Sequence, residues 1–207
     1  MLAKIEAGGY ERAEGRHSNA FIEDGDRIIE LGAGLGFMSA LITSRKQIAD
    51  YVAIEADPRL FDMIHRTHDL NGLSGPLTVR TCVATCNQEL IDAGSTKFYV
   101  GEKFCASSLL GARNLKSVVE VPVVALPELI RERRANVLIV DVEGAETDIF
   151  NGSPLETVER ILAEIHLNRI GRDGIRDIFR NLDALGFVYD PAASAGSVCG
   201  FRRIEET

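Results

Sequence analysis

A short apolar segment that runs into three alternating glycines constrains the fold of this chain more than any other feature. Residues 28–31 have the composition of a buried strand, and Gly32, Gly34 and Gly36 follow directly. Glycine adopts backbone conformations closed to other residues and lets a ligand approach the main chain. The run therefore predicts a tight turn beneath a bound molecule, although a plain strand-to-helix turn would also account for the glycines alone.

A second apolar segment, residues 51–54, ends in a carboxylate. Glu55 lies 23 residues after Gly32, close to the separation of about 20 residues at which a carboxylate on the second strand binds ribose hydroxyls. A solvated carboxylate at the end of the strand is the alternative interpretation. Together, the glycine turn and the acidic strand end predict a cofactor that contains a nucleoside.

The third glycine helps to select the cofactor. The dinucleotide pattern G-x-G-x-x-G requires glycine at position 37, where this chain has Phe37, so NAD and FAD are disfavoured. The G-x-G-x-G form, with Glu30 two residues before its first glycine, resembles motif I of class I S-adenosylmethionine-dependent methyltransferases. This resemblance implies a loop under the methionine part of the cofactor and Glu55 on the ribose. The expected cofactor-binding residues are Glu30, Gly32, Ala33, Gly34, Gly36, Phe37, Glu55, Ala56, Val83, Ala84 and Asp141.

Composition predicts a single enzyme-sized domain over residues 1–207. The chain has 45% hydrophobic residues, enough for a full core, and no apolar run long enough for a membrane span or a signal peptide. We therefore expect a cytoplasmic protein without membrane contact. Four cysteines without a C-x-x-C pair predict buried free thiols. The net charge of −8 disfavours a nucleic-acid partner, because such binding draws on clustered Lys and Arg.

Apolar strands and amphipathic helices alternate along the chain, which predicts an α/β fold with a doubly wound, Rossmann-like sheet. We expect about seven strands, mostly parallel, with an antiparallel strand in a carboxyl-terminal hairpin. A helical segment is expected within residues 1–25, and residues 97–121 are expected to form an inserted hairpin whose loop covers the cofactor. Strands are predicted at 27–30, 51–54, 77–82, 137–140 and 161–166, and helices at 36–46, 58–71, 126–134, 145–150 and 173–185.

The segment that follows residues 137–140 carries a second cluster of chemistry. An apolar strand delivers Asp141, Glu143 and Glu146 to its carboxyl end, the edge at which ligands bind in open α/β sheets. Asp141 and Glu143 are predicted to project into the crevice. Glu146 falls in the first turn of the next helix, where a carboxylate also stabilises the helix terminus, so capping and function remain equally open for it.

A histidine follows the next predicted strand. Alternation over residues 161–166 places Glu164 and His166 on one face at the strand end. Because the unperturbed pKa of histidine lies near neutrality, His166 is a candidate general base, with a structural histidine as the alternative. His65 and His68 have no comparable setting and are expected on a helix surface.

At this point the chain resembles a narrower family, the FkbM-type methyltransferases, over nearly its whole length. The matching motifs occur in the family's order, and the most specific is D-V-E-G-x-E at residues 141–146; the others are at residues 30–37, 53–58, 70–73, 107–109, 121–126 and 164–166. The resemblance implies S-adenosylmethionine-dependent O-methylation of a hydroxyl on a small molecule, sugar or natural product.

The predicted mechanism is in-line methyl transfer from the sulfonium to an acceptor oxygen, with His166 as the base and Asp141 or Glu143 orienting it or the acceptor. No metal is assigned as a required cofactor. A metal-assisted reaction, with Asp141, Glu143 and Glu164 as oxygen ligands, stays open as an alternative. A binding module that holds S-adenosylmethionine or a nucleotide without catalysis is the other alternative, because a fold does not fix a function.

Overall fold

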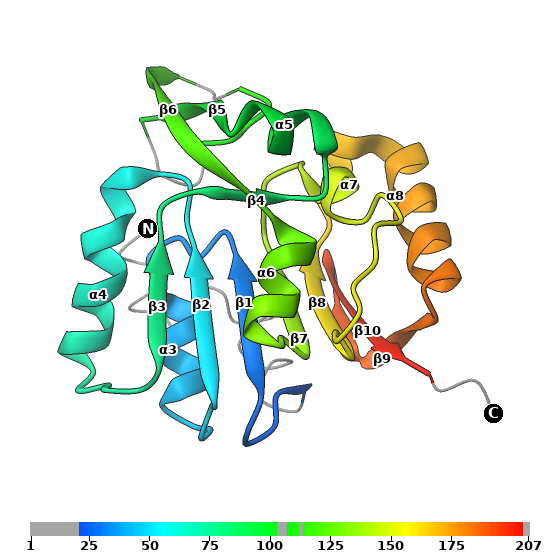
Figure 1. Ribbon diagram of the computed structural model, residues 1–207, viewed down its shortest axis with the longest axis horizontal. Coiled ribbons are helices and arrows are strands. Elements are labelled where there is room, and N and C mark those ends of the chain that lie inside the picture. Colours follow the sequence, from blue (N-terminus) through cyan, green and yellow to red (C-terminus); the bar gives the residue numbers. More distant parts are fainter. Residues whose placement is uncertain (1–20, 103–106, 112–113, 205–207) are drawn as a thin grey trace.

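A seven-stranded sheet forms the centre of the computed structural model, which describes residues 21–102, 107–111 and 114–204. The strand order is β3-β2-β1-β7-β8-β10-β9 (Figure 1). The first five of these strands are parallel, and β10 is antiparallel to both of its neighbours. This arrangement confirms the predicted doubly wound sheet with an antiparallel strand near the carboxyl end. The strands are β1 (Arg27–Leu31), β2 (Asp50–Ile54), β3 (Leu77–Arg80), β7 (Val137–Val140), β8 (Arg160–Glu164), β9 (Phe187–Ala195) and β10 (Val198–Arg203).

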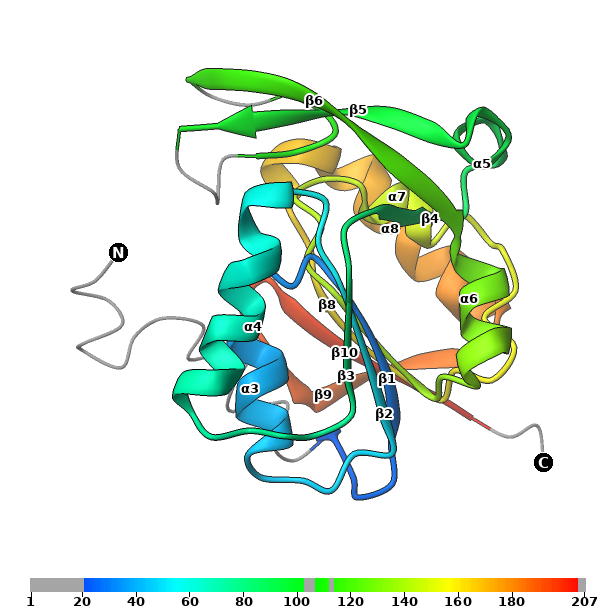
Figure 2. The ribbon, with the colours of Figure 1, turned by 60° about the vertical axis from the view of Figure 1, so that its left-hand side comes forward.

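Helices cover both faces of the sheet, as Figure 2 shows. One layer holds α3 (Phe37–Thr43) and α4 (Phe61–Leu70), which follows the short 3-10 turn η1 (Pro58–Leu60). The other layer holds α6 (Leu126–Arg133) and α8 (Leu167–Ala184). Side chains alternate along each strand, so Ile28 packs in the core under α3 and α4, and Ile29 packs in the core under α6 and α8. This two-sided burial explains why the strands are almost wholly apolar.

A smaller sheet of order β4-β6-β5 lies over the carboxyl edge of the main sheet, in green at the top of Figure 1. It consists of β4 (Val83–Thr85), β5 (Ser95–Gly101) and β6 (Leu115–Ala125), with α5 (Gln88–Ala93) between its first two strands. β5 and β6 pair antiparallel, with Lys97 opposite Glu120, so this part of the chain is a hairpin as expected. β4 and α5 were not predicted, although Asn87 caps α5 through its side chain and Gly94 ends it in a left-handed conformation.

The amino-terminal helix expected within residues 1–25 lies almost entirely outside the described residues. The described part begins at Phe21, which is fully buried beneath α3 with Ile22. Its carbonyl accepts a hydrogen bond from the buried guanidinium of Arg160, which also pairs with Asp26 at 2.6 Å. This ion pair fixes the point at which the chain enters the sheet.

The expectation that His68 lies on the surface was wrong. His68 is buried, and its Nε2 lies 2.9 Å from the Ser39 hydroxyl on α3. His68 lies four positions after the buried Ile64, so both side chains face α3, and the serine gives the imidazole a hydrogen-bond partner. His65 is exposed as expected.

The cysteines that the structure describes carry free thiols. Cys82 and Cys86 are buried and Cys199 is partly buried, while Cys105 falls outside the described residues. Burial raises the pKa of the Cys86 thiol to about 11, so this sulfur is protonated and unreactive at neutral pH. Within the described ranges, no helix is both long and apolar enough to span a bilayer.

Candidate active site

The glycine loop crosses the carboxyl ends of β1, β2 and β7. The amides of Gly32 and Ala33 both donate to the carbonyl of Ile54, at 2.9 and 3.0 Å. A Cβ on Gly32 would lie 1.7 Å from the carbonyl oxygen of Asp141, and φ at Gly32 is +84°. Only glycine fits there, because the main chains of β1 and β7 touch at this point.

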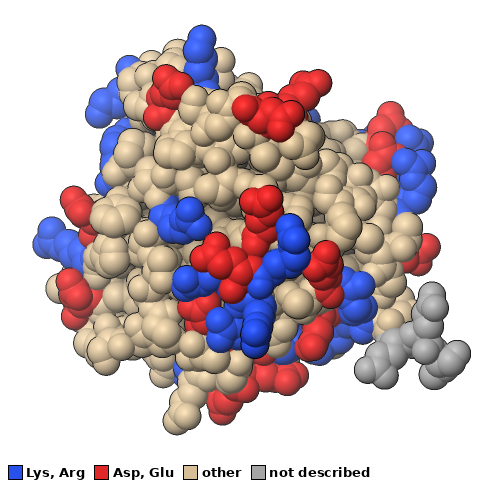
Figure 3. Space-filling model, viewed as in Figure 1, with Lys and Arg blue, Asp and Glu red and all other residues tan. Residues whose placement is uncertain are grey.

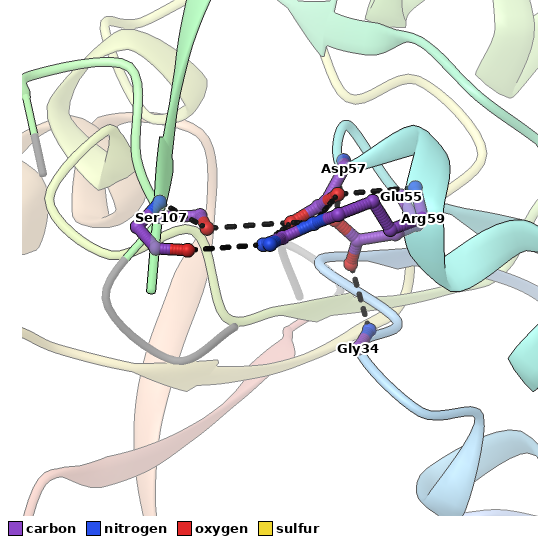
Figure 4. Close-up of polar contacts among 6 residues, drawn as sticks. Gly34, Glu55, Asp57, Arg59 and Ser107 are labelled. Carbon is purple, nitrogen blue, oxygen red and sulfur yellow. Dashed lines mark hydrogen bonds and ion pairs between the residues drawn. The ribbon is translucent and has the colours of Figure 1, made fainter. Parts of the chain in front are cut away.

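Glu55 closes one end of the loop, as Figure 4 shows. Its carboxylate is buried and accepts hydrogen bonds from the amides of Gly34 and Asp57, each at 2.8 Å. Burial raises the pKa of Glu55 to about 7, against the lowering effect of these two amides. A Cβ on Gly34 would meet no atom within 4 Å, so the space above its main chain is open for a ligand that reaches Glu55.

A cavity of about 160 Å³ occupies this open space, between the main sheet and the smaller one. Apolar side chains such as Ile54, Val83 and Phe98 form its walls, and Glu55 supplies an acceptor for hydroxyl groups. These are the features of a nucleoside site, so the residues present fit the expected cofactor. The predicted residues that line this donor cavity are Gly32, Gly34, Glu55, Ala56, Val83, Ala84 and Asp141.

The other predicted cofactor residues divide into two groups. Glu30 and Ala33 line a smaller hollow on the α3 side, which shares Gly32 and Asp141 with the donor cavity. Gly36 and Phe37 lie outside both spaces. Gly36 is needed for helix packing, because a Cβ there would come within 2.8 Å of Ile64 on α4, and Phe37 begins α3 and packs against the core.

The buried carboxylate of Asp57, which was not among the predicted site residues, holds the roof of the donor cavity in place. Asp57 binds the Arg59 guanidinium at 2.6 Å and accepts from the Ser107 hydroxyl at 3.3 Å (Figure 4). Ser107 also accepts from the Gly101 amide, and Ser108 and Leu109 extend the lining. Asp57 and Ser107 belong to the quoted family motifs, but only their proximity in space indicates a shared role.

The acidic edge, formed by Asp141, Glu143, Glu146 and His166, lies beside the donor cavity. Nδ1 of His166 donates to Oε1 of the fully buried Glu146 at 2.6 Å. The same oxygen accepts from the Gly144 amide at 3.0 Å. Nε2 of His166 lies 3.7 Å from a carboxylate oxygen of Asp141 and 3.7 Å from one of Glu143. The imidazole is therefore fixed on one side by Glu146, and its other nitrogen faces the carboxylates that line the cavity.

The local backbone directs these side chains toward one another. Glu143 has φ of +50° and Gly144 has φ of +108°, two successive left-handed residues between β7 and α7 (Glu146–Ile149). Such a conformation is costly for glutamate and occurs where the surrounding structure imposes it. Here it carries the Glu143 side chain toward His166 and the Gly144 amide toward Glu146.

The charge of His166 follows from this crowding. Burial by itself lowers the pKa of the imidazole, but the hydrogen bond to Glu146 and the charges of Glu146, Asp141 and Glu143 outweigh it and raise the pKa to about 9. Burial raises the pKa of Glu143, which the positive charges of His166 and Arg169 partly offset. At neutral pH, His166 is therefore an imidazolium surrounded by carboxylates.

Glu164 does not join the acidic edge in the way the strand pattern predicted. β8 ends at Glu164, and His166 already occupies the residue before α8, so the two residues do not share a strand face. The Glu164 carboxylate accepts from the Ser197 hydroxyl at 2.9 Å and lines the smaller hollow. Conversely, Glu146, for which the sequence left capping and function equally open, forms the hydrogen bond that holds His166.

Solved structures with the same fold come from several bacteria. A putative tRNA (m1A22) methyltransferase from Streptococcus pneumoniae, in complex with S-adenosyl-L-methionine, matches with a TM-score of 0.54 and 14% identity. The match covers 95% of this chain and 75% of that one. A putative rRNA methylase from Clostridium thermocellum matches with a TM-score of 0.53 and 9% identity, over 93% and 94% of the two chains. At these identities the matches establish the Rossmann-like methyltransferase fold and nothing finer.

Sequence comparison gives the family. No curated protein matches the chain, but the model of the methyltransferase FkbM domain matches residues 30–189. That range contains the glycine loop, Glu55 and the complete acidic edge. This match confirms the family, and the cofactor S-adenosylmethionine, that the sequence motifs predicted. The chain belongs to the FkbM methyltransferase family.

Proposed function

We propose that this protein transfers the methyl group of S-adenosylmethionine to a hydroxyl of a small molecule or glycan. The observation that carries the proposal is the position of His166, whose Nε2 lies 3.7 Å from Asp141, a residue that lines the donor cavity. Removing a hydroxyl proton requires a base within reach of the cofactor, and the acidic edge supplies one beside that cavity. Glu55 accepts from the ribose hydroxyls, and the Gly32–Gly34 main chain supports the methionine part.

The reaction breaks the bond between the sulfonium sulfur and the methyl carbon and forms a bond from that carbon to the acceptor oxygen. The hydroxyl proton passes to Nε2 of His166, which must first lose its own proton. Glu146 is a positioning residue, since it holds Nδ1 and fixes the orientation of the ring. Asp141 and Glu143 attract the positive charge of the cofactor and orient the acceptor hydroxyl. The products are the methyl ether and S-adenosylhomocysteine.

The charge distribution supports a small-molecule or glycan acceptor. The chain carries a net charge of −8, and in the face shown in Figure 3 basic side chains lie among acidic ones instead of forming a separate basic surface. Nucleic-acid binding depends on clustered positive charge, and the group next to the donor cavity is acidic. These charges favour a small-molecule or glycan acceptor over the RNA mentioned in the names of two neighbours.

Two measurements test the proposal. Calorimetric titration of the purified protein with S-adenosylhomocysteine and, separately, NAD is expected to show binding of the first only. Transfer of labelled methyl groups is then measured with a panel of hydroxylated glycosides and aromatic alcohols, and with tRNA and rRNA in parallel. Methylation of a hydroxylated small molecule supports the proposal. Methylation of RNA alone contradicts the acceptor class, and cofactor binding without transfer to any acceptor favours a binding module.

A metal-assisted reaction is the second candidate, and one observation favours it. One ligand atom each from Asp141, Glu143 and His166 lies within 4.8 Å of the others. Two carboxylates and an imidazole are ligands for a divalent cation, and the Glu146 contact to Nδ1 is the kind of second contact that orients a metal-bound histidine. The ligand set differs from the one expected, because His166 replaces Glu164. Full activity after exhaustive chelation would contradict the metal-assisted reaction. Loss of activity that Mg²⁺ or Mn²⁺ restores would support it.

A further inference from the structure

A groove of about 320 Å³ runs beside the donor cavity, across the loop that carries Gly144. Leu109 and Ala145 line both spaces, so the groove and the cavity share a wall. The groove lies between α5 on one side and α7 with the first turn of α8 on the other. Its principal side chains are Leu90, Leu109, Leu110, Thr147, Arg169 and Ile170.

The walls of the groove are fixed by contacts between its two sides, one of them made by Asp148, which lines the groove. Asp148 on α7 forms a hydrogen bond with the side chain of Asn87, which caps α5, and Asn151 donates to the carbonyl of Cys86 at 3.2 Å. These contacts hold α5 at a set distance from α7. On the α8 side, Ile170 packs against Gly174, where a Cβ would lie 2.9 Å from the Cβ of Ile170. The groove is therefore a feature of the folded chain and needs no ligand to hold it open.

The groove combines aliphatic surface with polar side chains, among them Thr147, Asp148 and Arg169. Leu90 and Ile170 contribute aliphatic surface on opposite sides, and Leu110 leaves 62% of its surface exposed at the rim. Arg169 marks the end of the groove nearest the acidic edge, because its guanidinium lies 3.9 Å from the Glu143 carboxylate. Covering an exposed leucine with a ligand favours binding, by about 25 cal/mol for each Å² of apolar surface removed from water.

We infer that this groove binds the methyl acceptor and that the acceptor is an amphiphile. Its hydroxyl-bearing polar part faces Arg169 and the acidic edge, and its alkyl or aromatic part lies along Leu90, Leu110 and Ile170. A bare sugar would leave the aliphatic walls in contact with water, whereas a glycoside or alcohol with an apolar group covers them. The inference rests on the proposed function, since it takes the acidic edge as the place where the hydroxyl reacts.

A single introduced fluorophore tests the inference, because the chain has no tryptophan. The Leu110→Trp variant, saturated with S-adenosylhomocysteine, is titrated with octyl β-glucoside below its micelle concentration and with methyl β-glucoside. We expect a blue shift of the emission with the octyl compound, half-complete at a concentration at least about tenfold lower than any response to the methyl compound. Leu70→Trp is the matched control, since Leu70 is 75% exposed at the end of α4, outside the groove.

Calorimetry of the unmodified protein with the same two glucosides provides a readout that does not depend on the introduced side chain. The Ile170→Asp variant places a charge in the groove and is expected to weaken octyl glucoside binding by about tenfold or more while S-adenosylhomocysteine binding persists. Equal affinity for the two glucosides, or an equal response from Leu70→Trp, overturns the inference. Failure of the unmodified protein to bind S-adenosylhomocysteine would instead contradict the proposed function.

Discussion

At the donor cavity the main chain supplies most of the defining contacts, whereas at the acidic edge side chains hold one another. Gly32 and Gly34 act through their amides and through the space that they leave, and Glu55 is held by two main-chain amides. His166, by contrast, is held by Glu146, which comes from a different segment. The donor cavity should therefore respond most strongly to changes of backbone geometry, and the acidic edge to changes of charge.

The largest effect is expected from Gly32→Ala. The added Cβ would lie 1.7 Å from the carbonyl oxygen of Asp141, so β1 and β7 must separate or the loop must unfold. We expect a loss of at least about 4 kcal/mol in the free energy of unfolding and no detectable S-adenosylhomocysteine binding, measured by denaturant titration and calorimetry. Gly75→Ala is the control, because its Cβ would meet only Thr43 at 3.8 Å. Similar stability of the two variants would remove the steric argument.

The next largest effect is expected from His166→Ala, which removes the proposed base and leaves the donor cavity intact. The methyl-transfer rate on the best acceptor of the panel should fall by about 10²–10⁴-fold, the usual contribution of a general base. S-adenosylhomocysteine affinity should change little, because His166 does not line the donor cavity. The exposed His65 on α4 provides a control in His65→Ala. Unchanged turnover in His166→Ala would rule out this residue as the base.

Glu55→Gln tests whether the Glu55 carboxylate binds the ribose of the cofactor. Loss of the charged acceptor is expected to weaken S-adenosylhomocysteine binding by about 10–100-fold, as for hydrogen bonds to a charged group. The exposed Glu128 on α6 gives the matched control, Glu128→Gln, which should leave this affinity unchanged. An unaltered affinity in Glu55→Gln would show that the carboxylate does not bind the ribose.

Glu55 should also make the stability of the cofactor-free protein depend on pH. Its pKa is raised from 4.5 to about 7 in the folded state, so the folded protein keeps a proton that the unfolded chain has lost. This contribution is complete below pH 4.5 and is lost as the pH rises through 7. The wild type should therefore lose free energy of unfolding between pH 4 and pH 8, whereas Glu55→Gln should not. The difference between the two proteins should change by about 1–3 kcal/mol in favour of the variant over this range. Parallel pH curves for the two proteins would contradict the assignment.

The smallest effect is expected from Glu146→Gln, and it concerns the pH profile. Because the pKa of His166 is raised to about 9, the wild-type rate should increase with pH as the imidazolium loses its proton. Removing the negative charge of Glu146 removes the largest influence that raises this pKa. The rising limb should then move to lower pH, with a smaller maximum because the ring is less well oriented. An unshifted limb would show that another group controls the rate.

The difference between the two regions also explains what could be predicted from the sequence. The glycine turn follows the first strand and Glu55 follows the second, so local backbone rules were enough to indicate that both lie at the carboxyl edge of the sheet. Gly36 was predicted as the third glycine of the G-x-G-x-G motif, and the structure adds that its lack of a side chain lets the loop pack against Ile64 on α4, while Phe37 begins α3. The roof contact between Asp57 and Ser107 joins residues 50 positions apart, which no local pattern indicates.

The sequence by itself determined the alternating strands and helices of the main sheet, the glycine turn, the cofactor and the family, because each depends on periodicity, on glycine conformation or on a contiguous motif. Only the tertiary structure decided the partners of His166. Strand alternation paired it with Glu164, but β8 ends before the histidine, and the turn into α8 brings the imidazole against Glu146 instead. A side chain beyond the end of a strand takes its direction from the packing of the next element, and this long-range contact is what local sequence rules do not contain.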